Sequence, residues 1–269
     1  MPELPEVETT LRGVSPHLVG STVREVIVRH KGLRWPVPDT IHLLESEKIL
    51  SGTRRGKYLL FKAKPGTLLI HLGMSGALRL SDADTPWRKH DHVAFQLDTG
   101  KQLRFHDPRR FGCVLLIDDP ATHPLLAPLG PEPLGADFDA AYLQQQLKGK
   151  KANIKQAIMD SHLVVGVGNI YACEALFMAG IQPQKAAGKV ARSSLVKLVS
   201  AIKEVLAASI DMGGTTLRDF LRENGEPGYF KQTLRVYDLE DEPCRECQTP
   251  VRRIVQSNRS TFFCPQCQR

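Results

Sequence analysis

The chain of 269 residues has 42% hydrophobic residues, and its 36 Lys and Arg against 29 Asp and Glu give a formal net charge of +7. This size suits two modest domains rather than one large one, and the moderate positive charge is compatible with binding a polyanion. No apolar run approaches the roughly 18 residues of a membrane span, and the acidic N-terminus lacks the basic and then apolar pattern of a signal peptide. The sequence thus argues against a membrane-spanning or secreted protein and predicts an intracellular one.

The N-terminal segment places Pro2 directly before Glu3, and we expect Met1 to be removed because Pro2 is small enough for aminopeptidase trimming. Removal leaves a secondary amine beside a carboxylate, and an α-amino group has a pKa of roughly 7.7–8.0, so a useful fraction is unprotonated near neutrality. Condensation with an aldehyde carbon gives an iminium without an N–H proton, which stays charged and acts as an electron sink. The alternative is an ordinary helix start, since apolar residues follow at helical spacing: Leu4, Val7, Leu11 and Val14.

Residues 22–117 show many short apolar segments separated by turn signals such as Pro65-Gly66 and Thr99-Gly100. Their regular spacing predicts a β-sandwich. The expected strands are 22–28, 57–63, 67–72, 92–97, 101–106 and 113–117. Residues 118–139 are rich in proline and lack periodicity, which indicates a connection between domains.

Beyond residue 139, apolar periodicity predicts helices over 140–148, 152–159, 169–179 and 193–212. Residues 165–170 form a glycine-bearing turn before the third of these helices, where backbone N–H groups can approach a phosphate. On its own this pattern is more often a tight turn. Residues 107–112 combine an arginine pair with Phe111 in a turn between strands, which suits insertion into a duplex.

Four of the six cysteines form two Cys-x-x-Cys pairs near the C-terminus, namely Cys244, Cys247, Cys264 and Cys267. The sixteen residues between the pairs are long enough for a β-hairpin, and the spacing is that of a tetrahedral zinc site. Two disulfides are the alternative, which an intracellular protein disfavours. We therefore expect one structural Zn²⁺ that supplies most of the folding free energy of this small segment. Cys113 and Cys173 are expected to be packing residues.

Taken together, these motifs resemble the formamidopyrimidine-DNA glycosylase family of bacterial base-excision repair over essentially the whole chain. The segments that carry the resemblance are 2–9, 71–76, 89–92, 107–112, 129–134, 166–171 and the cysteine-rich C-terminus. The resemblance implies an α+β fold: an N-terminal two-sheet β-sandwich with an N-terminal helix, a helical helix-two-turn-helix domain and a zinc-finger β-hairpin. The implied domains are 1–130, 131–235 and 236–269, with double-stranded DNA bound across the cleft.

The resemblance also implies a mechanism and a set of site residues. Pro2 attacks the sugar carbon of a flipped oxidised purine nucleotide, Glu3 protonates the opening sugar, and β,δ-elimination assisted by Lys57 then cuts the abasic strand. Residues 213–229 resemble a loop that covers the extruded base, and Glu6 is expected near the lesion pocket. The implied catalytic residues are Pro2, Glu3, Lys57 and Arg259, and the implied DNA contacts are Met74, His90, Arg109, Phe111, Lys150, Asn169 and Tyr237.

Two other interpretations stay open at this point. A sister glycosylase for oxidised pyrimidines, of the endonuclease VIII type, shares the Pro-Glu start and the zinc, although the 107–112 turn favours the purine branch. A non-catalytic zinc protein that binds and bends DNA is the alternative from another class, and Pro2, Glu3 and Lys57 argue against it. For single residues, Met74 is also compatible with a core position, His90 with a structural hydrogen bond, and Tyr237 with packing on the finger. We further expect a cytoplasmic, nucleoid-associated monomer.

Overall fold

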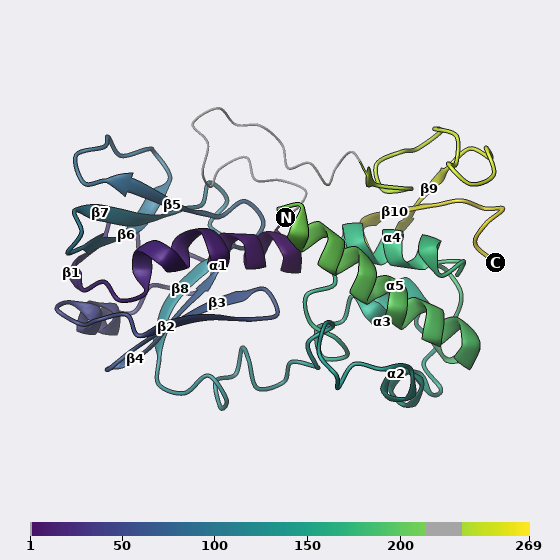
Figure 1. Cartoon of the computed structure of the whole chain (residues 1–269), viewed down its shortest axis with the longest axis horizontal. Helices are drawn as coiled ribbons and strands as arrows, with labels where there is room; N and C mark the ends of the chain where they lie inside the picture. Colours follow the sequence, from purple (N-terminus) through teal and green to yellow (C-terminus); the bar gives the residue numbers. More distant parts are fainter. Residues whose placement is uncertain (1, 214–232) are drawn as a thin grey trace. The chain divides into compact units, whose positions relative to one another are not determined.

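The computed structural model of the chain describes residues 2–213 and 233–269. These residues fall into two compact units, and the chain passes from the first to the second between Pro128 and Leu129 (Figure 1). The division into three domains at 130 and 235 stays a prediction. The segment 213–229, expected to cover a flipped base, lies outside the described residues apart from Gly213.

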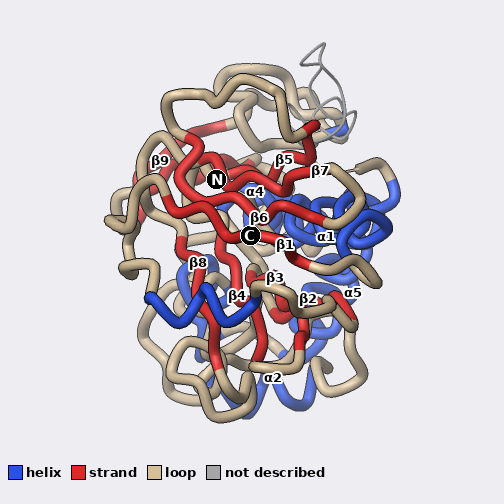
Figure 2. Tube along the Cα trace, turned by 90° about the vertical axis from the view of Figure 1, so that its left-hand side faces the viewer, coloured by secondary structure: helices blue, strands red, loops and turns tan. Residues whose placement is uncertain are grey.

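The first unit contains two antiparallel four-stranded sheets among its described residues. One has the order β1-β6-β7-β5 and consists of Val23–Val28, Asp91–Leu97, Lys101–His106 and Ala77–Asp82. The other has the order β2-β3-β4-β8 and consists of Ser51–Arg55, Tyr58–Ala63, Gly66–His71 and Cys113–Ile117. Figure 2 shows the two groups of strands one beneath the other. The predicted two-sheet architecture is confirmed.

The core of this unit lies between the sheets and under the first helix. Helix α1 (Leu4–Leu18) places Val7, Leu11 and Val14 in the same buried cluster as Phe61 and Phe95. A short 3-10 helix, η1 (Asp39–Leu44), adds further apolar side chains to it. The apolar spacing at the N-terminus therefore does form a helix, and Pro2 and Glu3 stand immediately before it.

Two strands of the first unit were not predicted from the sequence, β2 and β5. Each lies at the edge of its sheet, and β2 reads Ser-Gly-Thr-Arg-Arg without a buried residue. An edge strand with a solvated face has little need of apolar alternation, so the signal that identified the other strands is weak there. Strand β3 begins at Tyr58 rather than Lys57. Arg55 and Tyr58 are the last paired residues of the hairpin, and Gly56 and Lys57 form the two-residue turn between them.

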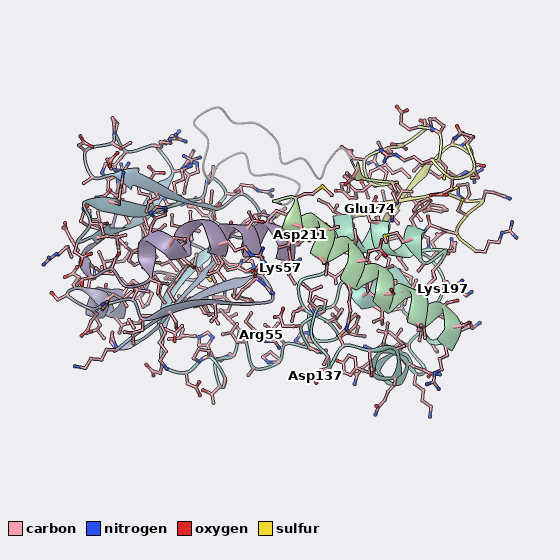
Figure 3. All side chains as sticks on the ribbon, in the orientation of Figure 1. Arg55, Lys57, Asp137, Glu174, Lys197 and Asp211 are labelled. Atoms are coloured by element: carbon pink, nitrogen blue, oxygen red, sulfur yellow. The ribbon has the colours of Figure 1, made fainter. Side chains whose placement is uncertain are left out.

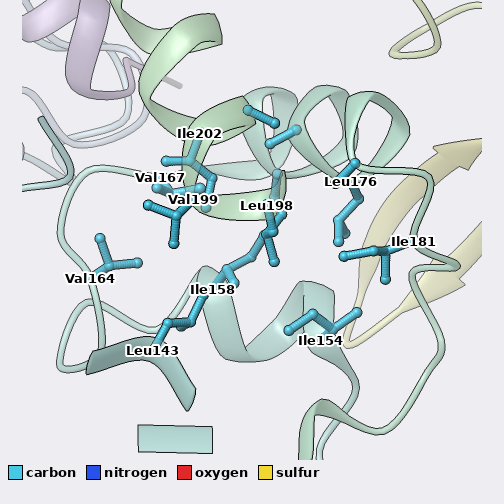
Figure 4. Close-up of a cluster of buried hydrophobic side chains, with 14 of the residues drawn as sticks. Leu143, Ile154, Ile158, Val164, Val167, Leu176, Ile181, Leu198, Val199 and Ile202 are labelled. Carbon is cyan, nitrogen blue, oxygen red and sulfur yellow. The ribbon is translucent and has the colours of Figure 1, made fainter. Parts of the chain in front are cut away.

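The second unit is helical, with α2 (Ala140–Leu147), α3 (Ile154–Ile158), α4 (Asn169–Met178) and α5 (Arg192–Asp211), and a 3-10 turn η2 (Ala187–Lys189). Side chains at helix N-termini set two of these starts. Asp139 accepts a hydrogen bond from Tyr142 N, and Asn153 accepts one from Gln156 N, so α3 begins two residues later than expected. Apolar side chains from all four helices form one core (Figure 4).

The C-terminal hairpin belongs to this second unit. Strands β9 (Arg252–Gln256) and β10 (Arg259–Phe263) pair antiparallel, and the turn between them has φ of 49° at Ser257 and 60° at Asn258. Two consecutive left-handed residues are typical of a type I′ hairpin turn. Strand β10 packs against α4. Within the described ranges, none of the helices has both the length and the apolar character needed to span a membrane.

Candidate functional site

The first turn of α1 fixes Glu3 beside Pro2. Glu3 is the N-cap residue, and its backbone N donates to Glu6 Oε2 at 2.9 Å in a reciprocal capping box. Glu3 is only 2% exposed, and Pro2 is partly buried. The two residues are thus held in one defined arrangement. Glu6, expected near the lesion pocket, uses its carboxylate to hold the backbone of Glu3.

The hairpin that carries Lys57 is tied to the same helix. Arg54 on β2 donates from Nε to Glu8 Oε2 at 2.9 Å and from Nη1 to Gly56 O at 2.8 Å. Burial alone would raise the pKa of Glu8, but the hydrogen bonds and charges of Arg54 and Arg12 outweigh it and hold that pKa below its ordinary value. Figure 3 labels Lys57 on this hairpin. One partly buried ion pair therefore joins the helix after Pro2 to the turn that holds Lys57.

His71 lies beside this hairpin and was not singled out from the sequence. Its ring centroid is 4.8 Å from that of Tyr58, and its Nδ1 accepts a hydrogen bond from Gly73 N at 3.0 Å. Burial, followed by the positive charges of Lys57 and Arg34, lowers the pKa of His71 to about 4. The imidazole is therefore neutral at pH 7, with its proton on Nε2. Burial also raises the pKa of the neighbouring Cys113 thiol to about 12, which makes it unreactive and agrees with a packing role.

Two loops bring Met74, Arg109 and Phe111 to one region of the first unit. Asp107 is fully buried and links the loops, because its Oδ1 accepts from Ser75 Oγ at 2.7 Å and its Oδ2 from Gly112 N at 2.8 Å. Gly73 faces the second loop so closely that a Cβ there would lie 2.4 Å from Gly112 N.

Despite this fixed base, the three side chains project outward. Met74 is 40% and Phe111 42% exposed, and the guanidinium of Arg109 lies 4.9 Å from the centre of the Phe111 ring. A side chain with this exposure is not part of the core, so a core position for Met74 is wrong.

His90 lies at the end of the loop before β6. Its ring stands near those of His92 and His106, with centroids 6.2 Å and 5.9 Å away, and its backbone O accepts from Asp107 N at 3.0 Å. Asp107 therefore contacts both the loop that carries His90 and the turn that presents Arg109 and Phe111.

In the second unit, a buried lysine organises the start of α4 and the finger. Lys155 is 2% exposed, and its Nζ donates to Asn169 Oδ1 at 2.6 Å, Thr261 Oγ1 at 2.6 Å and Ser260 O at 3.1 Å. Asn169 in turn donates from Nδ2 to Ser260 O at 2.9 Å. Asn169 is therefore fixed directly against the residue that follows Arg259.

Arg259 is exposed at the first position of β10 and lines a pocket of about 230 Å³ with Lys155 and Asp160. Lys150 is exposed in the loop after α2, where Gly188 N donates to its backbone O at 3.0 Å. Burial alone would raise the pKa of Asp160, but hydrogen bonds and charge from His162, together with the charge of Lys150, lower it. Lys150 therefore acts on Asp160 through its charge, and Lys155 and Arg259 line one pocket with this carboxylate.

Tyr237 is partly buried, with its ring centroid 5.1 Å from that of Phe262 on the finger. Its backbone N donates to Glu174 Oε1 at 2.9 Å, and the same carboxylate accepts from the N atoms of Arg235 and Val236. Burial raises the pKa of Glu174 although these three hydrogen bonds oppose it. Glu174 on α4 (Figure 3) therefore clamps the segment that leads into the finger. Packing of Tyr237 on the finger is confirmed, and its DNA contact stays a prediction.

The four predicted metal ligands converge at the end of the hairpin. The Sγ atoms of Cys244, Cys247, Cys264 and Cys267 all lie within 4.8 Å of one another. Two Sγ–Sγ separations between the pairs, 3.5 Å and 3.9 Å, are far longer than an S–S bond. Hydrogen bonds from Thr249 lower the pKa of Cys247 to about 6, which favours the thiolate that zinc binds. Four converging cysteine thiols fit one tetrahedral Zn²⁺, whose role is structural because no open ligand position is left.

Sequence reasoning missed Lys155 and Glu174, although both leave a signal. Each is a charged residue inside an otherwise apolar helical segment, and a charge on a buried face requires a partner. The pattern could have indicated a buried polar network, but most of its partners come from residues 61 to 106 positions away and follow only from the fold.

Comparison with known families gives matches along the chain. The formamidopyrimidine-DNA glycosylase N-terminal domain matches residues 1–114, the H2TH domain of the same enzyme residues 129–221, and a zinc finger found in FPG and IleRS residues 241–269. The formamidopyrimidine-DNA glycosylases of Thioalkalivibrio sulfidiphilus and Thiobacillus denitrificans are 58% and 55% identical to the chain, with 100% of both chains covered in each case.

Solved structures agree with these matches. MutM (FPG) of Thermus thermophilus is 40% identical with a TM-score of 0.88, covering 99% of this chain and 98% of its own. A Lactococcus lactis FPG mutant in complex with DNA containing Fapy-dG is 33% identical with a TM-score of 0.92, and the alignment covers 100% of both chains.

Proposed function

Because the chain belongs to the formamidopyrimidine-DNA glycosylase family, we propose that it excises 8-oxoguanine and formamidopyrimidines from duplex DNA through Pro2 and then cleaves the abasic strand. The chain is a base-excision repair glycosylase with one structural zinc. The observation that carries the proposed chemistry is the N-terminus of α1, where Pro2 precedes the buried Glu3, whose backbone N donates to Glu6 Oε2.

The proposed reaction begins with the unprotonated amine of Pro2, after removal of Met1. Its nitrogen forms a bond to the anomeric carbon of the flipped nucleotide, and the glycosidic bond breaks with its electrons leaving on the oxidised base. Glu3 donates a proton to the ring oxygen as the sugar opens. The Glu3 side chain is buried at the start of α1, which shields it from bulk water.

The resulting iminium withdraws electrons and acidifies the adjacent C–H of the sugar. Loss of that proton expels the 3′ phosphate in β-elimination, and a second loss expels the 5′ phosphate in δ-elimination. Lys57 is proposed to assist these steps, and its hairpin is tied to the helix after Pro2 by Arg54 and Glu8. The neutral His71 beside Lys57 adds no competing positive charge there at pH 7.

The DNA interface we propose uses residues from both units, each in its own setting. Met74 and Phe111 fill the gap left by the extruded nucleotide, and Arg109 contacts the opposite base. Asn169 and Arg259 hold phosphates on the hairpin side of the second unit, and His90, Lys150 and Tyr237 give further contacts.

The Lactococcus lactis structure with Fapy-dG DNA and a MutM complex with DNA containing carbocyclic 8-oxo-G indicate the lesion class. That lesion class supports the purine branch over the endonuclease VIII type.

The test is borohydride trapping on a duplex with one 8-oxoguanine opposite cytosine, followed by mass mapping of the cross-link. We expect the adduct on Pro2 in the processed protein and none in a matched protein that retains Met1. Glu3→Gln should bind the duplex and lose excision. Trapping on Lys57, or equal trapping with Met1 in place, would refute Pro2 as the nucleophile. Faster excision of thymine glycol than of 8-oxoguanine would refute the purine specificity. A monomeric state and a nucleoid-associated cytoplasmic location are part of the same proposal.

A further inference from the structure

A shallow pocket of about 370 Å³ lies in the first unit beside the turn at residues 107–112. Six of its lining residues are basic: Arg29, His30, Lys89, His90, His92 and Arg110. The pocket also has one carboxylate, that of the buried Asp91. This carboxylate already pairs with His106 Nδ1 at 2.8 Å and accepts a hydrogen bond from Arg88 N at 2.8 Å. The pocket therefore suits a compact anion such as a phosphodiester group.

The walls of this pocket are fixed. The Trp87 ring lies under two guanidinium groups, with Arg29 4.8 Å and Arg104 4.4 Å from its centre. Arg29 also donates from Nη1 to Arg88 O at 3.2 Å. These contacts hold the loop that carries Lys89 and His90 against the residue that follows β1.

Arg110 stands apart from its neighbour Arg109. Arg109 lies over the Phe111 ring, whereas Arg110 has a left-handed backbone with φ of 57° and places Nη1 at 2.7 Å from His30 Nε2. A guanidinium can only donate, so His30 Nε2 must be the acceptor. The imidazole in this contact is therefore neutral, with its proton on Nδ1.

We propose that His30 is a positioning residue whose neutral imidazole holds the Arg110 guanidinium in the pocket, where Arg110 and His90 together bind one phosphate of the DNA backbone. This inference rests on the proposed DNA contact of His90. The contribution of His30 is preorganisation: an exposed arginine held in its binding rotamer loses less side-chain entropy when the phosphate arrives.

A double-mutant cycle tests the proposal on the full, zinc-loaded chain. The variants are His30→Leu, Arg110→Ala and the pair, and the measurement is the Kd for a duplex carrying an uncleavable tetrahydrofuran abasic analogue. At pH 8 we expect His30→Leu to weaken binding about three- to tenfold, the size of the ordering entropy of one long side chain. In the Arg110→Ala background it should have no further effect. His30→Gln, which keeps an acceptor at a similar reach without titrating, should bind like the parent.

Equal losses from His30→Leu in both backgrounds, or a His30→Gln variant that binds as weakly as His30→Leu, would overturn the positioning role. If Arg110→Ala and His90→Ala both leave Kd unchanged, the proposed phosphate contact itself fails. Borohydride trapping at Pro2 under saturating DNA then reports separately on the catalytic proposal.

Discussion

Lys155 offers a sharp test of how the second unit holds its proposed DNA contacts, Asn169 and Arg259. Lys155→Met removes the ammonium and keeps a chain of similar length. Three acceptors then lose this donor, and Ser260 O retains its hydrogen bond from Asn169. A buried acceptor deprived of its donor costs about 1–3 kcal/mol, so Asn169 Oδ1 and Thr261 Oγ1 together lose about 2–6 kcal/mol. Relief from burying the ammonium offsets part of this loss and leaves about 2–4 kcal/mol.

This loss should appear locally. The chain has two tryptophans, Trp35 and Trp87, and both lie in the first unit, so their fluorescence does not report on the change. Hydrogen exchange measured by mass spectrometry reports on the second unit directly. We expect peptides covering 252–263 to exchange about 30-fold faster or more, while those covering 23–106 are unchanged. Affinity for lesion-containing duplex should fall about tenfold as Asn169 and Arg259 lose their fixed geometry.

The matched control is Lys151→Met, because Lys151 is exposed and its substitution removes the same charge nearby. It should reduce affinity only through long-range electrostatics and leave exchange of 252–263 as in the parent. Zinc content is measured in every variant so that metal loss is separated from loss of the lysine. Unchanged exchange and affinity in zinc-loaded Lys155→Met would refute the organising role of this lysine.

Three further predictions concern the metal and the titrating groups. Cys247→Ser should lose zinc by metal analysis and lower DNA affinity at least tenfold, while circular dichroism shows the β-sandwich still folded. The pKa of Glu8 is held below its ordinary value of 4.5. The ionised Glu8 therefore stabilises the fold above pH 4.5, and this stabilisation is lost as the pH falls through the folded pKa. The stability of Glu8→Gln should consequently depend less on pH below 4.5. His71, with a folded pKa of about 4, binds a proton more readily when unfolded, so stability falls as the pH drops from about 6.5 to 4. In an NMR titration its ring should stay neutral down to about pH 4, and a shift near pH 6.5 would contradict the burial and charge inferred for it.

Much of the fold was predictable because the buried segments carry periodic apolar patterns. The helix after Pro2, six of the strands and the four later helices follow from side chains that pack into one of two cores. The prediction failed at two of the four edge strands of the first unit, β2 and β5. Strand β2 has no buried residue and β5 buries only Ala77 and Leu78, so both contribute little of the apolar pattern that identified the other strands.

The candidate site was predictable only in part. Spacing identified the four cysteines, the chemistry of the N-terminal amine pointed to Pro2 and Glu3, and the resemblance supplied Lys57 and the DNA contacts. The residues that hold these groups were not identified, because a supporting hydrogen bond joins positions that only the fold brings together. Glu6, expected near the lesion pocket, also accepts a hydrogen bond from the backbone N of Glu3.

The finger shows why metal ligation alone does not explain a binding site. Zinc fixes the two Cys-x-x-Cys turns relative to each other, and the cysteine spacing reveals that much. The placement of the hairpin on the second unit comes from other groups, namely Glu174 at its start, Lys155 at β10, and Gln268, which donates from Nε2 to Ile181 O at 2.9 Å. Each of these partners lies on or next to α3 or α4. Arg259 is therefore positioned by two independent constraints, and losing either one should weaken DNA binding even when the other is intact.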